Sequence, residues 1–278
     1  MARSKVAKIV ALVLLLIAAG AFFGIACQRI NQQYELLLAL DRDMLPSLAQ
    51  LLLAVAGVAV IGGLVAALVR PTWISVVGFA LSAVAAFLAW ELSLASGLSA
   101  LIYFVVGALY GRGVAEALDK RVSFSVEAIA GSQSTLLAGL AIAAAVSLYF
   151  GYAAQVREEG FEFPPAVGEA ITEFSMAPMK SQIEARTDLT AREKEAAAEQ
   201  MREGFDQWMA SMEETIEPYE RFVPIAVAFM LFQVLAVINS LFFWVPMVVL
   251  GVLVPILTAV GAVKKTTETR EVERLSLG

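Results

Sequence analysis

The sequence contains no histidine and only one cysteine, Cys27. Histidine is the usual imidazole ligand of zinc, copper and haem, and the side chain that most readily carries protons near neutral pH. Its absence excludes histidine-ligated haem, HExxH zinc sites and Ser-His-Asp catalysis. A lone cysteine forms no intramolecular disulfide, and without a histidine Cys27 lacks the usual base that would activate it. We therefore expect no enzymatic activity, no metal site and no cofactor.

Charged residues are also scarce. They make up 17% of the 278 residues, against about 25% in a typical soluble domain. Hydrophobic residues make up 59%, and many stand in uncharged runs of about 20 residues, the length with which a helix crosses a hydrocarbon core of roughly 30 Å. The sequence thus predicts an all-α, polytopic membrane protein with about seven transmembrane helices. It shows no basic patch of the kind that binds nucleic acid.

The N-terminal part, residues 1–153, is predicted to be a membrane bundle of five spans. Their expected bounds are 9–26, 48–69, 73–91, 98–110 and 134–152. The first run fits either a signal peptide or a retained helix. We expect a retained helix, because the apolar run is long for a signal peptide. The fourth span is short for a full crossing.

The C-terminal part contains a second apolar region, residues 222–263, which carries no charge and is long enough for two spans. We predict that it forms a transmembrane hairpin with its tight turn at Asn239-Ser240. Pro246 and Pro255 are expected to kink the second helix of this hairpin. A polar tail, residues 264–278, follows.

One long polar segment, residues 154–221, separates the fifth and sixth spans, and we predict that it is an acidic, extramembrane helical hairpin. Thr190 and Glu193 have the spacing of a capping box, which marks the start of its second helix. An apolar stripe then recurs at steps of four, three, four and four, typical of one helix face. The stripe consists of Met201, Phe205, Trp208, Met212 and Ile216. It either closes the hairpin, which we favour, or forms the candidate surface for a protein partner or the membrane.

Polar residues inside the apolar runs are the other candidates for function, because ionisable groups within a membrane are rare and usually functional. Glu91 is the one carboxylate in a long apolar stretch, but it falls at a predicted turn, which favours an interfacial position. Gln233 and Asn239 lie in the sixth span. They form either hydrogen bonds between helices, the commoner role, or contacts with a solute.

Seven spans would place the two termini on opposite sides of the membrane. Basic residues near the early spans favour a cytoplasmic N-terminus under the positive-inside rule. They are Arg3, Lys5, Lys8, Arg70, Arg112, Lys120 and Arg121. The tail would then lie outside although it carries Lys264, Lys265, Arg270 and Arg274. We follow the early loops, since the first helix usually dominates, and expect a plasma-membrane protein whose acidic insert faces outward.

The leading functional expectation is a non-enzymatic accessory or scaffold subunit whose extramembrane helical domain binds a protein partner. The near absence of intramembrane charges and the single protruding domain favour it. The alternative is a small-solute permease or the solute-binding subunit of a transporter, because interrupted helices often line transport sites. The short span 98–110 and the kinks expected at Pro246 and Pro255 support this alternative.

Overall fold

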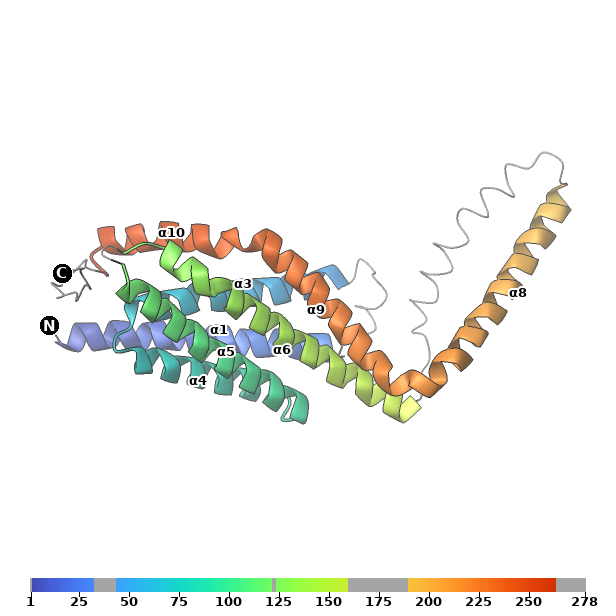
Figure 1. The fold of residues 1–278 in the computed structure, drawn as a ribbon, viewed down its shortest axis with the longest axis horizontal. Coiled ribbons are helices and arrows are strands. Elements are labelled where there is room, and N and C mark those ends of the chain that lie inside the picture. The colour runs from blue at the N-terminus through green and yellow to red at the C-terminus, as the bar shows by residue number, and fades with distance from the viewer. Residues whose placement is uncertain (1, 33–43, 122–123, 160–189, 264–278) are drawn as a thin grey trace, which may run out of the picture.

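The computed structural model describes residues 2–32, 44–121, 124–159 and 190–263, and every secondary-structure element in this part of the chain is a helix (Figure 1). The elements are α1 (Ala2–Gln32), α3 (Met44–Leu68), α4 (Thr72–Leu88), α5 (Leu94–Asp119), α6 (Glu127–Glu159), α8 (Ala191–Ile216), the short 3-10 helix η1 (Glu217–Phe222), α9 (Val223–Phe242) and α10 (Trp244–Ala259). The prediction of an all-α chain is confirmed for these residues.

Five of the helices are long and apolar enough to cross a membrane. They cover Lys5–Gln32, Leu45–Leu68, Leu94–Asp119, Glu127–Glu158 and Pro218–Phe242. Two further apolar helices, α4 and α10, are shorter. Runs of this length and composition are those of helices in a hydrocarbon core. The chain is therefore a membrane-embedded helical protein.

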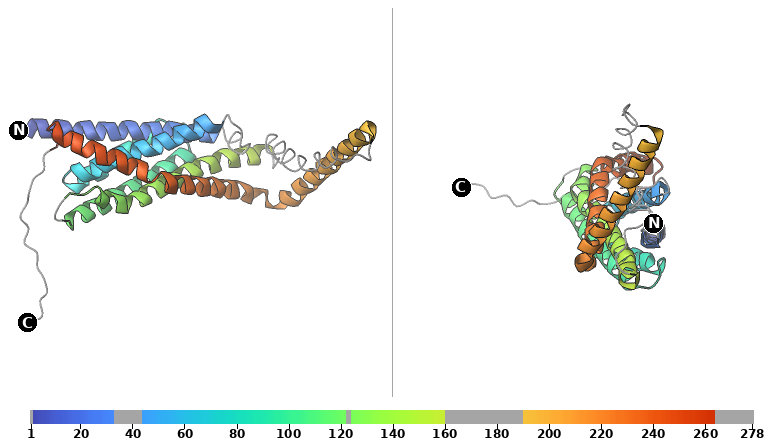
Figure 2. Two further views of the ribbon diagram at one scale, coloured as in Figure 1. Left: turned by 90° about the horizontal axis from the view of Figure 1, so that it is seen from above. Right: turned by 90° about the vertical axis from the view of Figure 1, so that its right-hand side faces the viewer.

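The helices α1, α3, α4, α5 and α6 pack into one bundle, with α9 against α6 and α10 against α3 (Figures 1 and 2). Aromatic rings from neighbouring helices fill its core. The Phe79 ring meets the rings of Tyr103 and Tyr110 edge-on, at centroid distances of 6.4 and 6.2 Å. Both tyrosine hydroxyls are bonded within the bundle, to Ser82 Oγ at 2.8 Å and to Gln133 Oε1 at 2.9 Å. This pairing is what buried tyrosines require.

The helices α1 and α4 approach each other closely. A Cβ atom at Gly20 would overlap Ser82, and one at Gly24 would overlap the backbone carbonyl of Ala86. Small residues four positions apart let two helix backbones come together, as in the GxxxG motif. The Ser82 hydroxyl adds a hydrogen bond of 2.6 Å to the carbonyl oxygen of Leu16 across the same contact. These two glycines therefore set how near α4 can lie to α1.

The helices α5 and α6 are longer than the spans predicted for them. The structure continues α5 to Asp119, past the predicted end at 110, and begins α6 at Glu127 instead of 134. Apolarity marks only the part of a helix that lies in lipid, whereas backbone hydrogen bonding carries the helix on into polar sequence. The start of α5 is fixed locally, since Ser93 and Ser96 form a capping box.

The predicted hairpin turn at Asn239-Ser240 is wrong, because both residues lie inside α9. Only Phe243 separates α9 from α10, and it keeps helical dihedral angles, with φ −50° and ψ −37°. The break has a physical cause. Pro246 has no N–H to donate, and its ring would clash with the carbonyl four residues earlier, that of Phe242. A proline of this kind bends a helix without reversing the chain, so α10 continues along the bundle beyond α9 (Figure 2).

The beginning of α1 and the end of α10 consequently lie at the same end of the bundle (Figure 1). The Lys8 ammonium donates to the carbonyl oxygens of Gly261 and Ala262, at 3.4 and 2.9 Å. A positive charge beside the last carbonyls of a helix also matches the helix dipole. The expectation that the two termini lie on opposite sides of the membrane assumed a chain reversal at Asn239-Ser240, where the structure continues α9. The side of the membrane on which each terminus lies stays a prediction.

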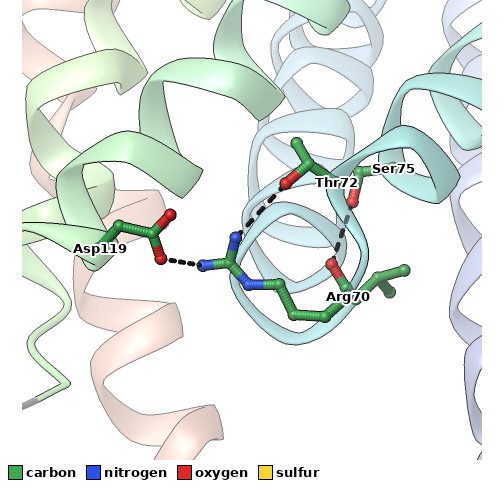
Figure 3. A network of polar contacts seen from close by, with 5 residues as sticks. Arg70, Thr72, Ser75 and Asp119 are labelled. Atoms are coloured by element: carbon green, nitrogen blue, oxygen red, sulfur yellow. Dashed lines mark hydrogen bonds and ion pairs between the residues drawn. The ribbon is translucent and has the colours of Figure 1, made fainter. Parts of the chain in front are cut away.

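The same end of the bundle carries the α3–α4 connection and the C-terminus of α5. The Arg70 guanidinium lies 3.6 Å from the Asp119 carboxylate and donates to Thr72 Oγ1 at 3.4 Å (Figure 3). Ser75 Oγ on α4 lies 3.3 Å from the carbonyl oxygen of Val65 and 3.5 Å from that of Val69, so its hydroxyl links the start of α4 to the end of α3. Both charged side chains are exposed to more than a third, so we expect this ion pair to contribute at most about 1 kcal/mol.

Candidate functional site

The helix α8 stands away from the bundle at the end opposite the termini (Figures 1 and 2). Its start was predicted correctly. Glu193 accepts the Thr190 backbone N–H at 2.8 Å, and Thr190 Oγ1 accepts the Glu193 N–H at 3.4 Å. These bonds satisfy two donors that a helix start otherwise leaves unpaired. Because the bond from the Thr190 backbone favours the charged form, it lowers the pKa of the Glu193 carboxyl, and the Thr190 hydroxyl acts in the same direction.

The apolar stripe of α8 is only partly covered. The Phe205 and Trp208 rings lie together with centroids 5.4 Å apart, and Trp208 is 48% exposed. Met212 and Ile216 are half-buried towards the end of α8 that leads into η1. The side chain of Met201 and the predicted first helix of the hairpin lie outside the described residues. The described part of the stripe therefore offers an exposed tryptophan on a projecting helix.

Glu91 lies in the connection between α4 and α5, where its side chain is exposed at one end of the bundle. The helix α4 ends at Leu88 and α5 begins at Leu94, so Glu91 lies in a connection, in agreement with the turn predicted there. The carboxylate thus sits at a bundle end and not among the packed helices. Within the described residues, no group of three or more Cys, Asp or Glu side chains is arranged to hold a metal ion.

Asn239 faces a groove between α3, α6, α9 and α10. Its Nδ2 donates to the carbonyl oxygen of Leu137 on α6 at 3.2 Å. The groove has a volume of about 150 Å³ and is lined by Leu52, Val55, Ala56, Leu137, Asn239, Phe242, Val245 and Pro246. Seven of these eight side chains are apolar, and the three from α3 come from the middle of that helix. Asn239 therefore ties α9 to α6 and provides the one polar group of an apolar groove.

Gln233 lies on a different face of α9. Six residues turn a helix by about 600°, which places two side chains about 120° apart around the axis. Gln233 accordingly points outward and is exposed, whereas Asn239 points towards α6. Within the part of the chain that the structure describes, the Gln233 side chain makes no hydrogen bond. The sequence places both amides in one span, whereas the fold places their side chains on different faces of α9.

The structure also contains buried polar contacts that sequence reasoning missed. Ser147 Oγ on α6 donates to the carbonyl oxygen of Cys27 at 2.6 Å, and Asn31 Nδ2 donates to that of Ser147 at 2.9 Å. Ser99 Oγ on α5 donates to the carbonyl oxygen of Ala143 at 3.0 Å. Hydroxyl and amide groups commonly join helices in this way. Their sequence signal is faint, since a serine in an apolar run does not reveal which helix it faces.

Gln133 lies just before the span predicted for residues 134–152, yet the structure places it in α6 and buries it fully. Its Oε1 accepts the Tyr110 hydroxyl, while its Nε2 has no partner among the described residues. A buried amide left half-satisfied is uncommon and costly. No local pattern distinguishes such a glutamine from one on the surface.

No protein-family model matches the chain, and neither a curated protein nor a solved structure shows significant similarity to it.

Proposed function

We propose that the protein is a non-enzymatic, multi-pass membrane subunit that holds a protein partner through α8. The observation that carries this proposal is the half-exposed Trp208, which packs beside Phe205 on a 26-residue helix that projects from the bundle. Tryptophan is enriched among the few residues that supply most of the binding energy at protein interfaces. Acidic side chains on the other faces of α8 keep the helix soluble around this apolar strip.

We further propose that the chain crosses the membrane six times, with α9 and α10 together forming one crossing. The 20 residues of α9 pack against α6, the 16 residues of α10 pack against α3, and together the two helices are about as long as the 33-residue α6. At about 1.5 Å per residue, both paths are roughly 50 Å long. The two terminal ends then share one side, as the Lys8 contacts support.

With six crossings, the basic C-terminal tail lies on the same side of the membrane as the basic residues near the early spans, so the two groups no longer disagree about orientation. The basic residues that then share the side of the termini are Arg3, Lys5, Lys8, Arg70, Arg112, Lys120, Arg121, Lys264, Lys265, Arg270 and Arg274. The short loops on the other side contribute Arg29 and Arg42. Under the positive-inside rule this distribution favours termini in the cytoplasm and α8 outside a plasma membrane.

The partner proposal is tested by purification from the native membrane in mild detergent, followed by mass spectrometry. We expect a stoichiometric protein that is lost from the Trp208→Ala/Met212→Ala variant. The matched control is Gln200→Ala/Gln207→Ala, which changes two exposed residues on α8 outside the stripe and should retain the partner. A wild-type chain that purifies alone, or a partner that both variants keep, would refute the proposal.

A second candidate function is that of a small-solute permease or the solute-binding subunit of a transporter. The groove at Asn239, beside the break between α9 and α10, favours it, because broken helices often border substrate sites near the membrane centre. We expect a bound small molecule in native mass spectra of the wild type and its loss on Asn239→Leu. Ser240→Ala, one residue away on the exposed side of α9, is the control.

A further inference from the structure

The outward face of α9 is an apolar surface that the rest of the chain leaves open. Of the five long apolar helices, α9 is the least covered by its neighbours. It packs mainly against α6 and lies at the edge of the bundle in Figures 1 and 2. Large side chains such as Val237 and Leu241 are 61% and 64% exposed. Exposed apolar side chains on a membrane helix contact either lipid or another helix.

Gln233 indicates which of the two contacts this face makes. Its side chain is exposed in the midst of these apolar residues and makes no hydrogen bond among the described residues. A primary amide carries two donors and an acceptor, and lipid chains offer it no partner. Placing it against hydrocarbon is therefore unfavourable, whereas a second helix with a polar side chain at the same depth relieves the cost.

The residues around Gln233 have the spacing of a helix-pair seam. Counting along α9, the steps alternate between four and three through Ala226, Met230, Gln233, Val237 and Ser240, and all five are exposed. This is the repeat that keeps one seam facing a partner helix in a left-handed pair. Ala226 and Ser240 are small, which allows the two backbones to approach at both ends of the seam.

We propose that the outward face of α9 binds α9 of a second copy of this chain, with the two Gln233 amides hydrogen-bonded to each other across a two-fold axis. Copies of one membrane protein insert in the same orientation and to the same depth, so each Gln233 automatically meets an identical group at its own level. An amide complements itself, because it donates and accepts. A two-fold contact uses the same patch on both copies. A different partner protein would need a polar group at that depth by coincidence.

The dimer places both α8 helices on the same side of the membrane. It does not depend on what α8 binds, so this inference and the proposed function can fail separately.

The test uses the full-length chain in its native membrane. In the Val237→Cys variant, a short thiol-specific cross-linker should join two copies into a covalent dimer. The wild type provides the background, since its one thiol, Cys27, is buried. Leu81→Cys, on the exposed face of α4, is the control and should remain monomeric. Equal cross-linking of both variants, or joining of Val237→Cys to a different protein, would overturn the proposal.

A second measurement tests the amide itself. We expect Gln233→Leu to weaken dimerisation in lipid vesicles by about tenfold, as measured by single-molecule photobleaching, because interhelical polar contacts in membranes are of modest strength. Gln233→Asn, which keeps the amide, should retain part of the affinity. Leucine has a similar size, and Gln233 bonds no other described residue, so the monomer should still fold. An unchanged dimer fraction in Gln233→Leu would refute the role of the amide.

Discussion

The Nζ atom of Lys8 lies 2.9 Å from the carbonyl oxygen of Ala262. This contact joins the first turns of α1 to the residues that follow α10, although 254 positions separate the two in sequence. It places both at one end of the bundle. The proposal of six membrane crossings rests on that arrangement.

The first prediction concerns topology. Green fluorescent protein fused after residue 278 should fluoresce in the cytoplasm, as should a fusion at the N-terminus, because six crossings return the chain to its starting side. Alkaline phosphatase is active only outside the cytoplasm, so a fusion inserted after α8 should be active. Opposite results for the two terminal fusions would restore an odd number of crossings.

The second prediction concerns the contact of α1 with α4. Gly24→Ala should lower the stability of the detergent-solubilised bundle by about 1–3 kcal/mol, since the new methyl group meets the Ala86 backbone and the helices must separate. Gly57→Ala in α3 adds the same methyl group where nothing lies within 4 Å. It should be neutral or stabilising, because alanine favours a helix over glycine. Thermal unfolding followed by circular dichroism compares the two variants. Equal losses of stability would contradict the close packing of α1 against α4.

The third prediction concerns the bond between Tyr110 and Gln133. Tyr110→Phe should destabilise the bundle by about 1–3 kcal/mol, because it leaves the whole Gln133 amide buried without a partner. Adding Gln133→Leu to this variant should recover much of the loss, since no unpaired polar group then remains. Unfolding of the single and double variants forms a double-mutant cycle. Additive losses would show that the two side chains do not interact.

The fourth prediction concerns the start of α8. The Glu193 pKa is lowered in the folded state, so the cap stabilises the helix fully above the carboxyl pKa of the unfolded chain. That stabilisation is lost as pH falls through the lower, folded pKa. Hydrogen exchange of the first amides of α8 should therefore speed up, relative to intrinsic rates, only in acid. Thr190→Ala should raise the Glu193 pKa measured by NMR titration; an unchanged value would refute the capping contact.

Features that depend on a few neighbouring residues could be predicted from the sequence. The helical, membrane-embedded class follows from the length of the apolar runs, because a helix needs about 20 apolar residues to cross the hydrocarbon core. The start of α8 follows from Thr190 and Glu193, three residues apart. The end of α3 and the start of α4 follow from Pro71, whose ring restricts the residue before it.

Other features depended on partners far away in the chain. A helix of 20 apolar residues does not reveal which side faces protein, so Gln233 and Asn239 looked alike until α6 supplied Leu137 as a partner for one of them. The predicted turn failed for a related reason. Asparagine and serine end a helix when they bond their own backbone, but here the Asn239 side chain bonds across to α6 and α9 continues.

The sequence by itself determined that the chain is helical, that it enters a membrane and where α8 begins, because hydrophobic length and capping are local properties. Only the tertiary structure decided that α9 and α10 run in one direction and that α1 contacts the residues after α10 through Lys8. It also decided that the Asn239 amide faces α6 while the Gln233 amide faces outward. The physical reason is that helix direction and helix facing are set by packing between segments, and packing energy is shared among residues that the sequence keeps far apart.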